Sequence, residues 1–216
     1  MKRNPSQLRA IAHLSGPMMV LAGPGSGKTS VIVERTAYMT GEGKIPGSSV
    51  LVVTFSRSAA REMKERFLKF TRQASTDVTF GTFHGVFYGI FKHAYGLGAG
   101  NILSEEEKYA ILKEMTLEYG QELTQEGDFQ EDVAKEISVV KGNRIALDHY
   151  YSSCCPDDVF RQIYTGYQKT LRERRKLDFD DMLLCCYQLF DRRKDILAAW
   201  QNKFQYLSLI HISEPT

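Results

Sequence analysis

Features that would fix the protein's class at once are scarce in this sequence. It has only four cysteines in 216 residues, in the adjacent pairs Cys154-Cys155 and Cys185-Cys186, and this spacing fits neither a zinc site nor a disulfide framework. The sequence has no run of about 18 apolar residues and starts with polar residues, so we expect neither a membrane helix nor a signal peptide. We therefore expect reduced thiols and a cytoplasmic location.

A strong excess of one charge is also missing. The sequence has 28 Lys+Arg and 26 Asp+Glu, a formal net charge of +2, so overall charge does not predict nucleic-acid binding and any such prediction must rest on local clusters. Hydrophobic residues make up 43% of the sequence and aromatic residues 11%. This is enough to build a core in one ordinary domain or in two small ones.

The first hundred residues alternate between strand and helix patterns. Short β-rich segments lie at residues 18–22, 50–54 and 76–80, and each is followed by a helical pattern, at residues 28–40, 58–72 and 84–95. Alternation at this spacing is typical of βαβ units with right-handed crossovers. We therefore predict an α/β fold in which helices flank a parallel sheet.

The pattern changes after Gly96, Gly98 and Gly100, where strand signals stop for about a hundred residues. Ser104 and Glu107 form a capping box, and apolar stripes with helical spacing follow. These stripes contain Ile111, Met115 and Tyr119, then Phe129, Val133, Ile137 and Val140, then Val159, Phe160, Ile163, Tyr167 and Leu171. We predict an all-helical subdomain at 101–175, inserted into the α/β domain between its segments 1–100 and 176–207. Segment 176–207 is expected to hold two helices, 180–190 and 194–204, before a strand at 204–210.

A glycine-rich loop follows the first predicted strand. Its residues are Ala22, Gly23, Pro24, Gly25, Ser26, Gly27, Lys28 and Thr29, which fits the phosphate-binding loop pattern with alanine in place of the first glycine. The glycines let backbone N–H groups face phosphate oxygens, and a helix starting at Lys28 adds positive potential. Lys28 is expected to reach the β- and γ-phosphates as a catalytic residue, and the Thr29 hydroxyl to act catalytically as a ligand of Mg²⁺. The alternative is a plain turn between strand and helix.

Four further segments accompany the loop. They are residues 4–7 (Asn-Pro-Ser-Gln), 53–63 (Val-Thr-Phe-Ser-Arg-Ser-Ala-Ala-Arg-Glu-Met), 81–85 (Gly-Thr-Phe-His-Gly) and 177–183 (Leu-Asp-Phe-Asp-Asp-Met-Leu). In this order the five motifs resemble the N-terminal half of superfamily 1 DNA helicases of the UvrD/Rep/PcrA type, from about residue 4 to residue 207. The resemblance implies a RecA-like P-loop NTPase domain and ATP-dependent 3′ to 5′ unwinding of DNA.

Two residues outside the loop belong to the expected nucleotide site. Gln7 lies about fifteen residues before the loop, where its amide can offer a donor and an acceptor to adenine, although an ordinary exposed glutamine is the alternative. The resemblance implies that Gln7 reads the adenine. Ser30 follows Thr29 where these helicases often have arginine, so the ATP contact at this position is in doubt.

The ends of the second and third predicted strands carry the expected DNA contacts. These residues are Thr54, Phe55, Ser56 and Arg57 after the second strand, and Thr82, Phe83 and His84 after the third. Ligands of parallel sheets bind at this edge, and hydroxyls, an arginine and aromatic rings suit single-stranded DNA. From the residues alone, Phe55 could instead be core, Ser56 a helix cap and His84 the partner of a buried carbonyl. The resemblance implies DNA contacts for both segments.

The acidic residues Asp178, Asp180 and Asp181 invite interpretation as a metal site. Asp180 and Asp181 are adjacent and point apart on a helix, so we do not expect them to share a metal ion. We expect Asp178 to cap that helix. A structural role, or a role along the DNA path, is implied by the matching motif.

The last residues depart from the resemblance. After Leu207 these helicases have an Asp-Glu pair that holds Mg²⁺ and activates water, whereas residues 208–216 contain Glu214 as their single acid. We expect residues 208–216 to be a tail foreign to the family, and a second motor domain to be missing. The 216 residues alone are then expected to bind nucleotide but to hydrolyse it poorly.

The sequence thus predicts the ATP-binding part of a DNA helicase. The expected cofactors are ATP and Mg²⁺, and the expected partners are single-stranded DNA and its junctions with duplex DNA. Two alternatives remain open: the helicase part of a recombination helicase–nuclease, and a non-catalytic ATP-gated module that binds single-stranded DNA. A small-molecule P-loop kinase is a weaker third, because it accounts for neither residues 54–57 nor residues 82–84.

Overall fold

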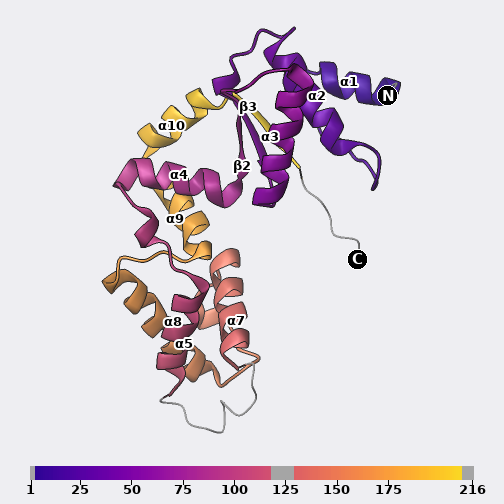
Figure 1. The fold of residues 1–216 in the computed structure, drawn as a ribbon. Coiled ribbons are helices and arrows are strands. Elements are labelled where there is room, and N and C mark those ends of the chain that lie inside the picture. The colour runs from indigo at the N-terminus through magenta and orange to yellow at the C-terminus, as the bar shows by residue number, and fades with distance from the viewer. Residues whose placement is uncertain (1–2, 118–128, 211–216) are drawn as a thin grey trace. The chain divides into compact units, whose positions relative to one another are not determined.

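The computed structural model describes residues 3–117 and 129–210, which form two compact units (Figure 1). The first unit contains Met1–Val86 and Arg193–Thr216, and the second contains Phe87–Arg192. Helix α4 (Phe83–Tyr95) begins in the first unit and continues into the second. Every helix within the described residues is too short or too polar to cross a membrane.

A parallel sheet of three strands organises the first unit. Strand β1 (Val50–Thr54) lies between β2 (Thr79–Thr82) and β3 (Tyr206–Leu209). In the register, Thr54 is opposite Thr82 and Val50 is opposite Tyr206. All five β1 residues are buried, as expected for a β-branched strand that is covered on both faces. The predicted strand at 50–54 is confirmed, and the one predicted at 76–80 begins three residues later.

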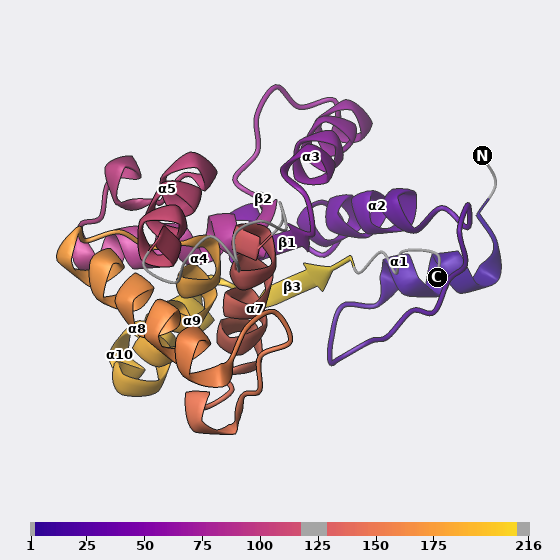
Figure 2. The ribbon, with the colours of Figure 1, turned by 90° about the horizontal axis from the view of Figure 1, so that it is seen from below.

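Four helices accompany the sheet in the first unit. They are α1 (Pro5–Ala12), α2 (Lys28–Thr40), α3 (Arg57–Thr71) and α10 (Lys194–Lys203), with the short η1 (Gly47–Ser49) before β1. Helices α2 and α3 lie next to each other (Figure 2). Their Met39 and Phe67 pack on Val50 and Val52 of β1 in one core cluster. The predicted α/β arrangement of a parallel sheet with flanking helices is confirmed.

The strand predicted at residues 18–22 is wrong. Residues 17–23 have no regular structure and pair with none of the three strands. The side chains of Met19 and Leu21 are 85% and 90% exposed, so this apolar run is not part of the core. An apolar segment forms a strand only where a neighbouring strand supplies hydrogen-bond partners. Among the described residues, β3 pairs with β1 alone, so residues 17–23 do not extend the sheet next to β3. The phosphate-binding loop is therefore not the end of a sheet strand.

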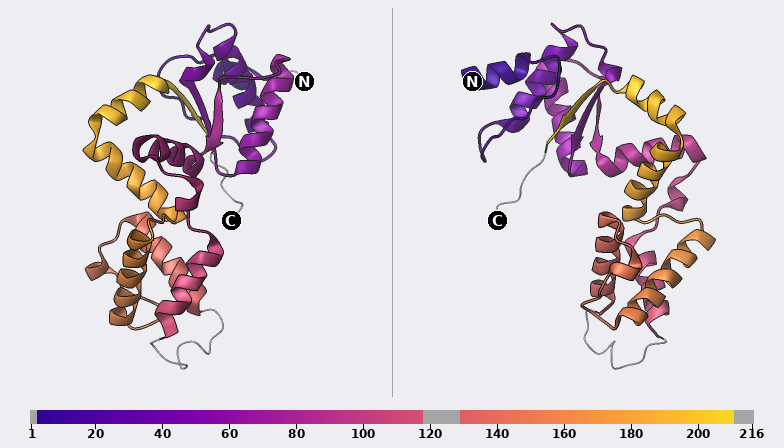
Figure 3. Two further views of the ribbon diagram at one scale, coloured as in Figure 1. Left: turned by 60° about the vertical axis from the view of Figure 1, so that its left-hand side comes forward. Right: turned by 180° about the vertical axis from the view of Figure 1, so that it is seen from behind.

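Helices build the second unit. Besides most of α4, they are α5 (Glu105–Thr116), α7 (Phe129–Asn143), α8 (Asp157–Glu173) and α9 (Phe179–Arg192), with the short η2 (Ala99–Asn101) and η4 (Leu147–His149) (Figure 3). The Ser104–Glu107 capping box is present at the start of α5. The predicted stripes form one core, with Ile111, Phe129, Val133, Ile137, Val140, Phe160, Ile163, Tyr167 and Leu171 buried together. Tyr119, predicted to extend the first stripe, lies outside the described residues.

The division into segments 1–100, 101–175, 176–207 and 208–216 stays a prediction. The second compact unit is longer than residues 101–175 at both ends. The two connections of the expected insertion run side by side within it, because Leu103 N donates to Leu177 O (2.8 Å) and Leu177 N donates to Asn101 O (2.8 Å). Ser208 and Leu209, expected in the tail, belong to β3, and residues 211–216 lie outside the described residues.

A buried group of charges ties three helices of the second unit together. The Lys141 ammonium of α7 lies 2.5 Å from Asp178 Oδ2 and 2.9 Å from Asp181 Oδ1, and the Tyr167 hydroxyl of α8 donates to Asp178 Oδ2 (2.9 Å). Asp181 N donates to Asp178 Oδ1 (2.8 Å), which confirms Asp178 as the cap of α9. Asp180 points elsewhere and accepts from Ser138 (2.6 Å). Lys141, with a side chain only 1% exposed, was not predicted.

The buried lysine sets the ionisation of its two partners. Burial raises the pKa of Asp181 to about 6, and the nearby Asp178 carboxylate adds to the rise. Burial alone would also raise the pKa of Asp178, but Lys141 lowers it below its ordinary value. One ammonium thus faces two carboxylates, and the carboxylate that it compensates less well is Asp181.

Replacing Lys141 with methionine should destabilise the second unit strongly. Removing one partner of a buried ion pair leaves uncompensated charge and costs about 3–5 kcal/mol. The orphaned carboxylates then have raised pKa values, so the folded unit takes up protons as the pH falls and regains part of this loss between pH 7.5 and pH 5. Native-state amide hydrogen exchange of α7 and α9 measures the free energy of opening at each pH.

Lys135 of the same helix is the matched control. It pairs with Glu131 and Asp132 on the surface, so Lys135→Met should leave the opening free energy unchanged. If Lys141→Met loses stability equally at both pH values, the carboxylates are not the source of the loss, and the electrostatic account of this cluster is wrong.

Candidate functional site

The glycine-rich loop forms a tight turn ahead of α2. Gly25 (φ 72°) and Gly27 (φ 82°) adopt left-handed backbone conformations, which disfavour any residue with a Cβ. Ser26 N donates to Gly23 O (3.3 Å), and Val31 N donates to Gly27 O (3.0 Å) as α2 begins. Gly27 caps the helix without a side chain. The first N–H groups of α2 therefore remain available to an anion at the helix N-terminus.

The predicted catalytic lysine folds back over this turn. Lys28 Nζ donates to the carbonyl oxygens of Ala22 (3.0 Å) and Gly23 (3.1 Å). The ammonium thus lies above the loop, where phosphate oxygens would compete with the two carbonyls for its hydrogens. Pro24 and Gly25 are the central residues of the turn that the hydrogen bond from Ser26 N to Gly23 O closes. Lys28 is at the first position of α2, as predicted from the sequence.

Thr29 and Ser30 occupy the second and third positions of α2. Magnesium keeps several waters and is usually held by substrate phosphates with only one or two protein oxygens. The single hydroxyl of Thr29 fits that demand. Within residues 3–117 and 129–210, no group of three or more His, Cys, Asp or Glu side chains is placed so that it could hold a metal ion.

Gln7 is attached to the loop. Its Nε2 donates to Ser26 O (3.1 Å), while its Oε1 accepts from Asn4 N (3.0 Å) in the capping box of α1. The amide is thus held in place by one donor bond and one acceptor bond. It keeps a second N–H and a second lone pair, so it can still offer the donor and acceptor pair that the sequence predicts for an adenine edge.

Arg3 joins the same corner, and the sequence analysis missed it. Its Nε donates to Glu34 Oε2 (2.9 Å) and its Nη2 donates to Glu34 Oε1. Hydrogen bonding to Glu34 raises the pKa of Arg3 above its ordinary value. The partners are 31 residues apart, so no local pattern indicates the pair. The ion pair connects the segment before α1 with α2, beside the loop.

The carboxyl edge of the sheet holds the second group of predicted residues. Thr54 and Thr82 are opposite each other in the register, at the ends of β1 and β2, so the sheet brings the starts of segments 54–57 and 82–84 together. Both threonines are buried. The Thr54 hydroxyl donates to Ser56 O (2.9 Å), and Thr82 Oγ1 accepts from Gly85 N (3.1 Å). These hydroxyls serve the backbone rather than facing solvent.

Aromatic rings and an arginine occupy the solvent side of this edge. The side chain of Phe55 is 82% exposed and that of Phe83 is 41% exposed, while Arg57 is exposed at the start of α3. The alternative that Phe55 belongs to the core is wrong. Ser56 does cap α3, because Ala59 N donates to its Oγ (3.1 Å). His84 is half-buried next to Phe83.

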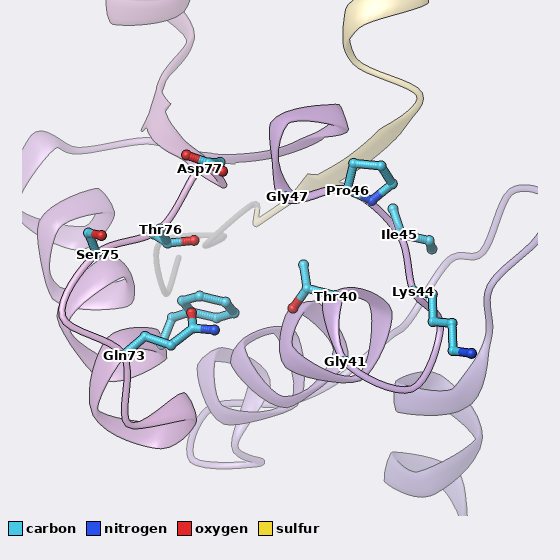
Figure 4. A pocket seen from close by; sticks show the side chains of 11 residues that line it. Thr40, Gly41, Lys44, Ile45, Pro46, Gly47, Gln73, Ser75, Thr76 and Asp77 are labelled. Atoms are coloured by element: carbon cyan, nitrogen blue, oxygen red, sulfur yellow. The ribbon is translucent and has the colours of Figure 1, made fainter.

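A cavity of about 510 Å³ lies at the opposite edge of the sheet (Figure 4). Its lining includes Gly47, just before β1, and Asp77, just before β2. Because ligands of open parallel sheets bind outside the carboxyl ends of the strands, this cavity at the amino ends is not the candidate site. The loop and the carboxyl ends of β1 and β2 remain the candidate site.

Comparison with known proteins agrees with this geometry. The profile of the UvrD/REP helicase N-terminal domain matches residues 3–210. The ATP-dependent DNA helicase PcrA of Bacillus subtilis is 32% identical over 218 aligned positions, which cover 98% of this chain and 29% of that protein. The ATP-dependent DNA helicase PcrA of Staphylococcus aureus is 30% identical over 223 positions, covering 98% and 29%. The chain thus spans less than a third of the length of these relatives.

Ser56→Ala should destabilise the first unit by about 1 kcal/mol, because a helix loses its side-chain cap. Ser58→Ala, at an exposed position in the first turn of the same helix, is the control and should change stability little. Urea unfolding of both variants measures the difference. If the two variants are equally stable, the Ser56 hydroxyl is not acting as a cap in solution.

Proposed function

The chain belongs to the family of UvrD/REP helicase N-terminal domains, and from this premise we propose that it is the nucleotide-binding part of an ATP-dependent DNA helicase. The observation that carries the proposal is the attachment of Gln7 to the loop through Ser26 O (3.1 Å). This hydrogen bond connects the Gln7 amide, which is suited to the edge of a base, with the glycine-rich turn, which is suited to phosphates. Both relatives compared above are named ATP-dependent DNA helicases.

In this proposal ATP lies across the loop and the N-terminus of α2. Backbone N–H groups of Gly25 and of residues 27–30 bind its phosphates, and Lys28 exchanges the Ala22 and Gly23 carbonyls for phosphate oxygens. Gln7 binds the adenine. Thr29 would hold Mg²⁺, which when bound neutralises phosphate charge. The chain's own residues bind and orient the nucleotide.

The carboxyl edge of β1 and β2 is the proposed path for single-stranded DNA. Exposed Phe55 and Phe83 offer faces on which bases can stack, and Arg57 offers a charge to the phosphates. Their backbone is fixed by Thr54, Thr82 and the Ser56 cap. The backbone that carries the rings therefore does not have to be ordered by the ligand, which reduces the entropic cost of binding.

Further parts of the proposal rest on the family alone. They are movement in the 3′ to 5′ direction, a preference for junctions of single-stranded and duplex DNA, work with a second motor domain, and a cytoplasmic location. The poor hydrolysis expected of these 216 residues stays a prediction. ATPase activity measured with and without single-stranded DNA tests it, and DNA-stimulated activity that Lys28→Ala abolishes would contradict it.

Lys28→Ala should abolish measurable ADP binding by the purified chain. The variant loses the ammonium that faces the phosphates, while the loop backbone stays intact. Isothermal titration calorimetry with ADP measures the change, and Lys44→Ala, an exposed lysine after α2 at the other edge of the sheet, is the control. Equal affinity of Lys28→Ala and the unmodified chain would rule out the loop as the nucleotide site.

Phe55→Ala should weaken binding of an oligo-dT probe by about 5- to 150-fold, because base stacking on one aromatic ring contributes roughly 1–3 kcal/mol. Stability should not change, since the ring is exposed. The control is Phe70→Ala near the end of α3, whose side chain is 56% exposed. Fluorescence anisotropy at fixed salt compares the two. Equal effects of the two variants would show that Phe55 has no specific part in binding.

A further inference from the structure

The guanidinium of Arg3 has one nitrogen without a role in the ion pair. Nε and Nη2 both donate to the carboxylate of Glu34. Within residues 3–117 and 129–210, Nη1 has no hydrogen-bond acceptor. The side chains of Arg3 and Glu34 are only 17% and 18% exposed, so the pair is held in place. A fixed guanidinium thus retains two directed N–H groups on Nη1.

Nη1 lies at the nucleotide loop. A Cβ placed on Gly27 would be 3.9 Å from Arg3 Nη1 and 3.7 Å from Gln7 Nε2. The two side chains therefore approach the same glycine, the cap of α2. Arg3 reaches it from the segment before α1 and is anchored to the second turn of α2 through Glu34. This position places Nη1 beside the amide proposed to bind the base.

We propose that Arg3 is a further nucleotide-binding residue, whose Nη1 donates to a neutral acceptor of the nucleoside. This inference rests on the nucleotide site proposed above and adds a residue to it. The Glu34 carboxylate neutralises the positive charge of the Arg3 guanidinium within the pair. Arg3 is therefore better suited to a neutral acceptor on the nucleoside than to the charged phosphates. What Arg3 offers is a directed donor more than a net positive charge, and ring nitrogens and ribose oxygens are suitable acceptors.

Glu34 is the positioning residue in this scheme. Its bidentate contact uses two of the three guanidinium nitrogens and orients the third, as paired N–H···O bonds do. The same contact holds the residue before the α1 cap against α2. Arg3 therefore links correct docking of α1 with recognition of the nucleoside.

The test compares two ligands of the purified chain, ADP and inorganic tripolyphosphate. Arg3→Leu should weaken ADP binding by about 3- to 10-fold, the loss typical of one hydrogen bond, and leave tripolyphosphate binding unchanged. Arg3→Lys, which keeps the charge but lacks the fork, should weaken ADP binding as well. Arg9→Leu is the control, since Arg9 lies on α1 and, among the described residues, donates only to Ser6 Oγ (3.2 Å).

The outcomes separate this inference from the proposed function. A wild-type chain that fails to bind ADP overturns the nucleotide site and the inference with it. Two results overturn the inference alone, provided that the wild-type chain binds ADP. Either the ADP affinity of Arg3→Leu equals that of the wild type, or Arg3→Leu loses affinity for ADP and for tripolyphosphate by the same factor. Repeating the comparison with 2′-deoxy-ADP identifies the acceptor: the effect of Arg3→Leu disappears if it is the 2′-hydroxyl and persists if it is elsewhere on the nucleoside. Thermal unfolding of each variant checks that α1 stays docked.

Discussion

Complete burial of β1 is the constraint on which the first unit depends. Each of its five residues is buried, so every backbone group must pair with a neighbouring strand and every side chain must meet a packed surface. Pairing with β2 and β3 satisfies the first demand. Helices α2 and α3 on one face, and Phe204 with Trp200 on the other, satisfy the second. The orientation of this strand then determines where residues 54–57 leave the core.

At the end of β1, neighbouring residues have different roles: some stabilise the backbone, and one is exposed to solvent. Thr54 and Ser56 use their hydroxyls on backbone groups, while Phe55, between them, has an 82% exposed ring. An exposed phenylalanine contributes little to folding, so its place is maintained by the hydrogen bonds on either side. The second unit follows another principle, because its polar groups Lys141, Asp178 and Asp181 are buried and connect helices. Polar side chains fix the backbone beside an exposed ring in the first unit and connect helices in the second.

How far the sequence predicts this structure depends on the range of the interactions involved. The start of α2 at Lys28 and the capping boxes of α1 and α5 are local features, because all their partners lie within four residues. Short-range sequence patterns predict the first and the third of these features and are consistent with the second. The strand at 18–22 fails because a strand depends on a distant partner. Lys141 continues the spacing Phe129, Val133, Ile137 by four residues, which is a signal of burial, although the burial of Lys141 was not predicted. No comparable signal existed for Arg3.

The conformation of the glycine-rich loop is fixed partly by residues outside the loop. Without a sheet strand before it, its conformation depends on Gly25 and Gly27 within the loop and on α2 after it. Gln7 adds a hydrogen bond from α1, and the Arg3–Glu34 pair ties the segment before α1 to α2. Each such contact lowers the number of conformations that a ligand would otherwise have to restrict. In the proposed site, a loop held in this way would meet phosphates with its groups already oriented, and Gln7 and Arg3 would meet the nucleoside.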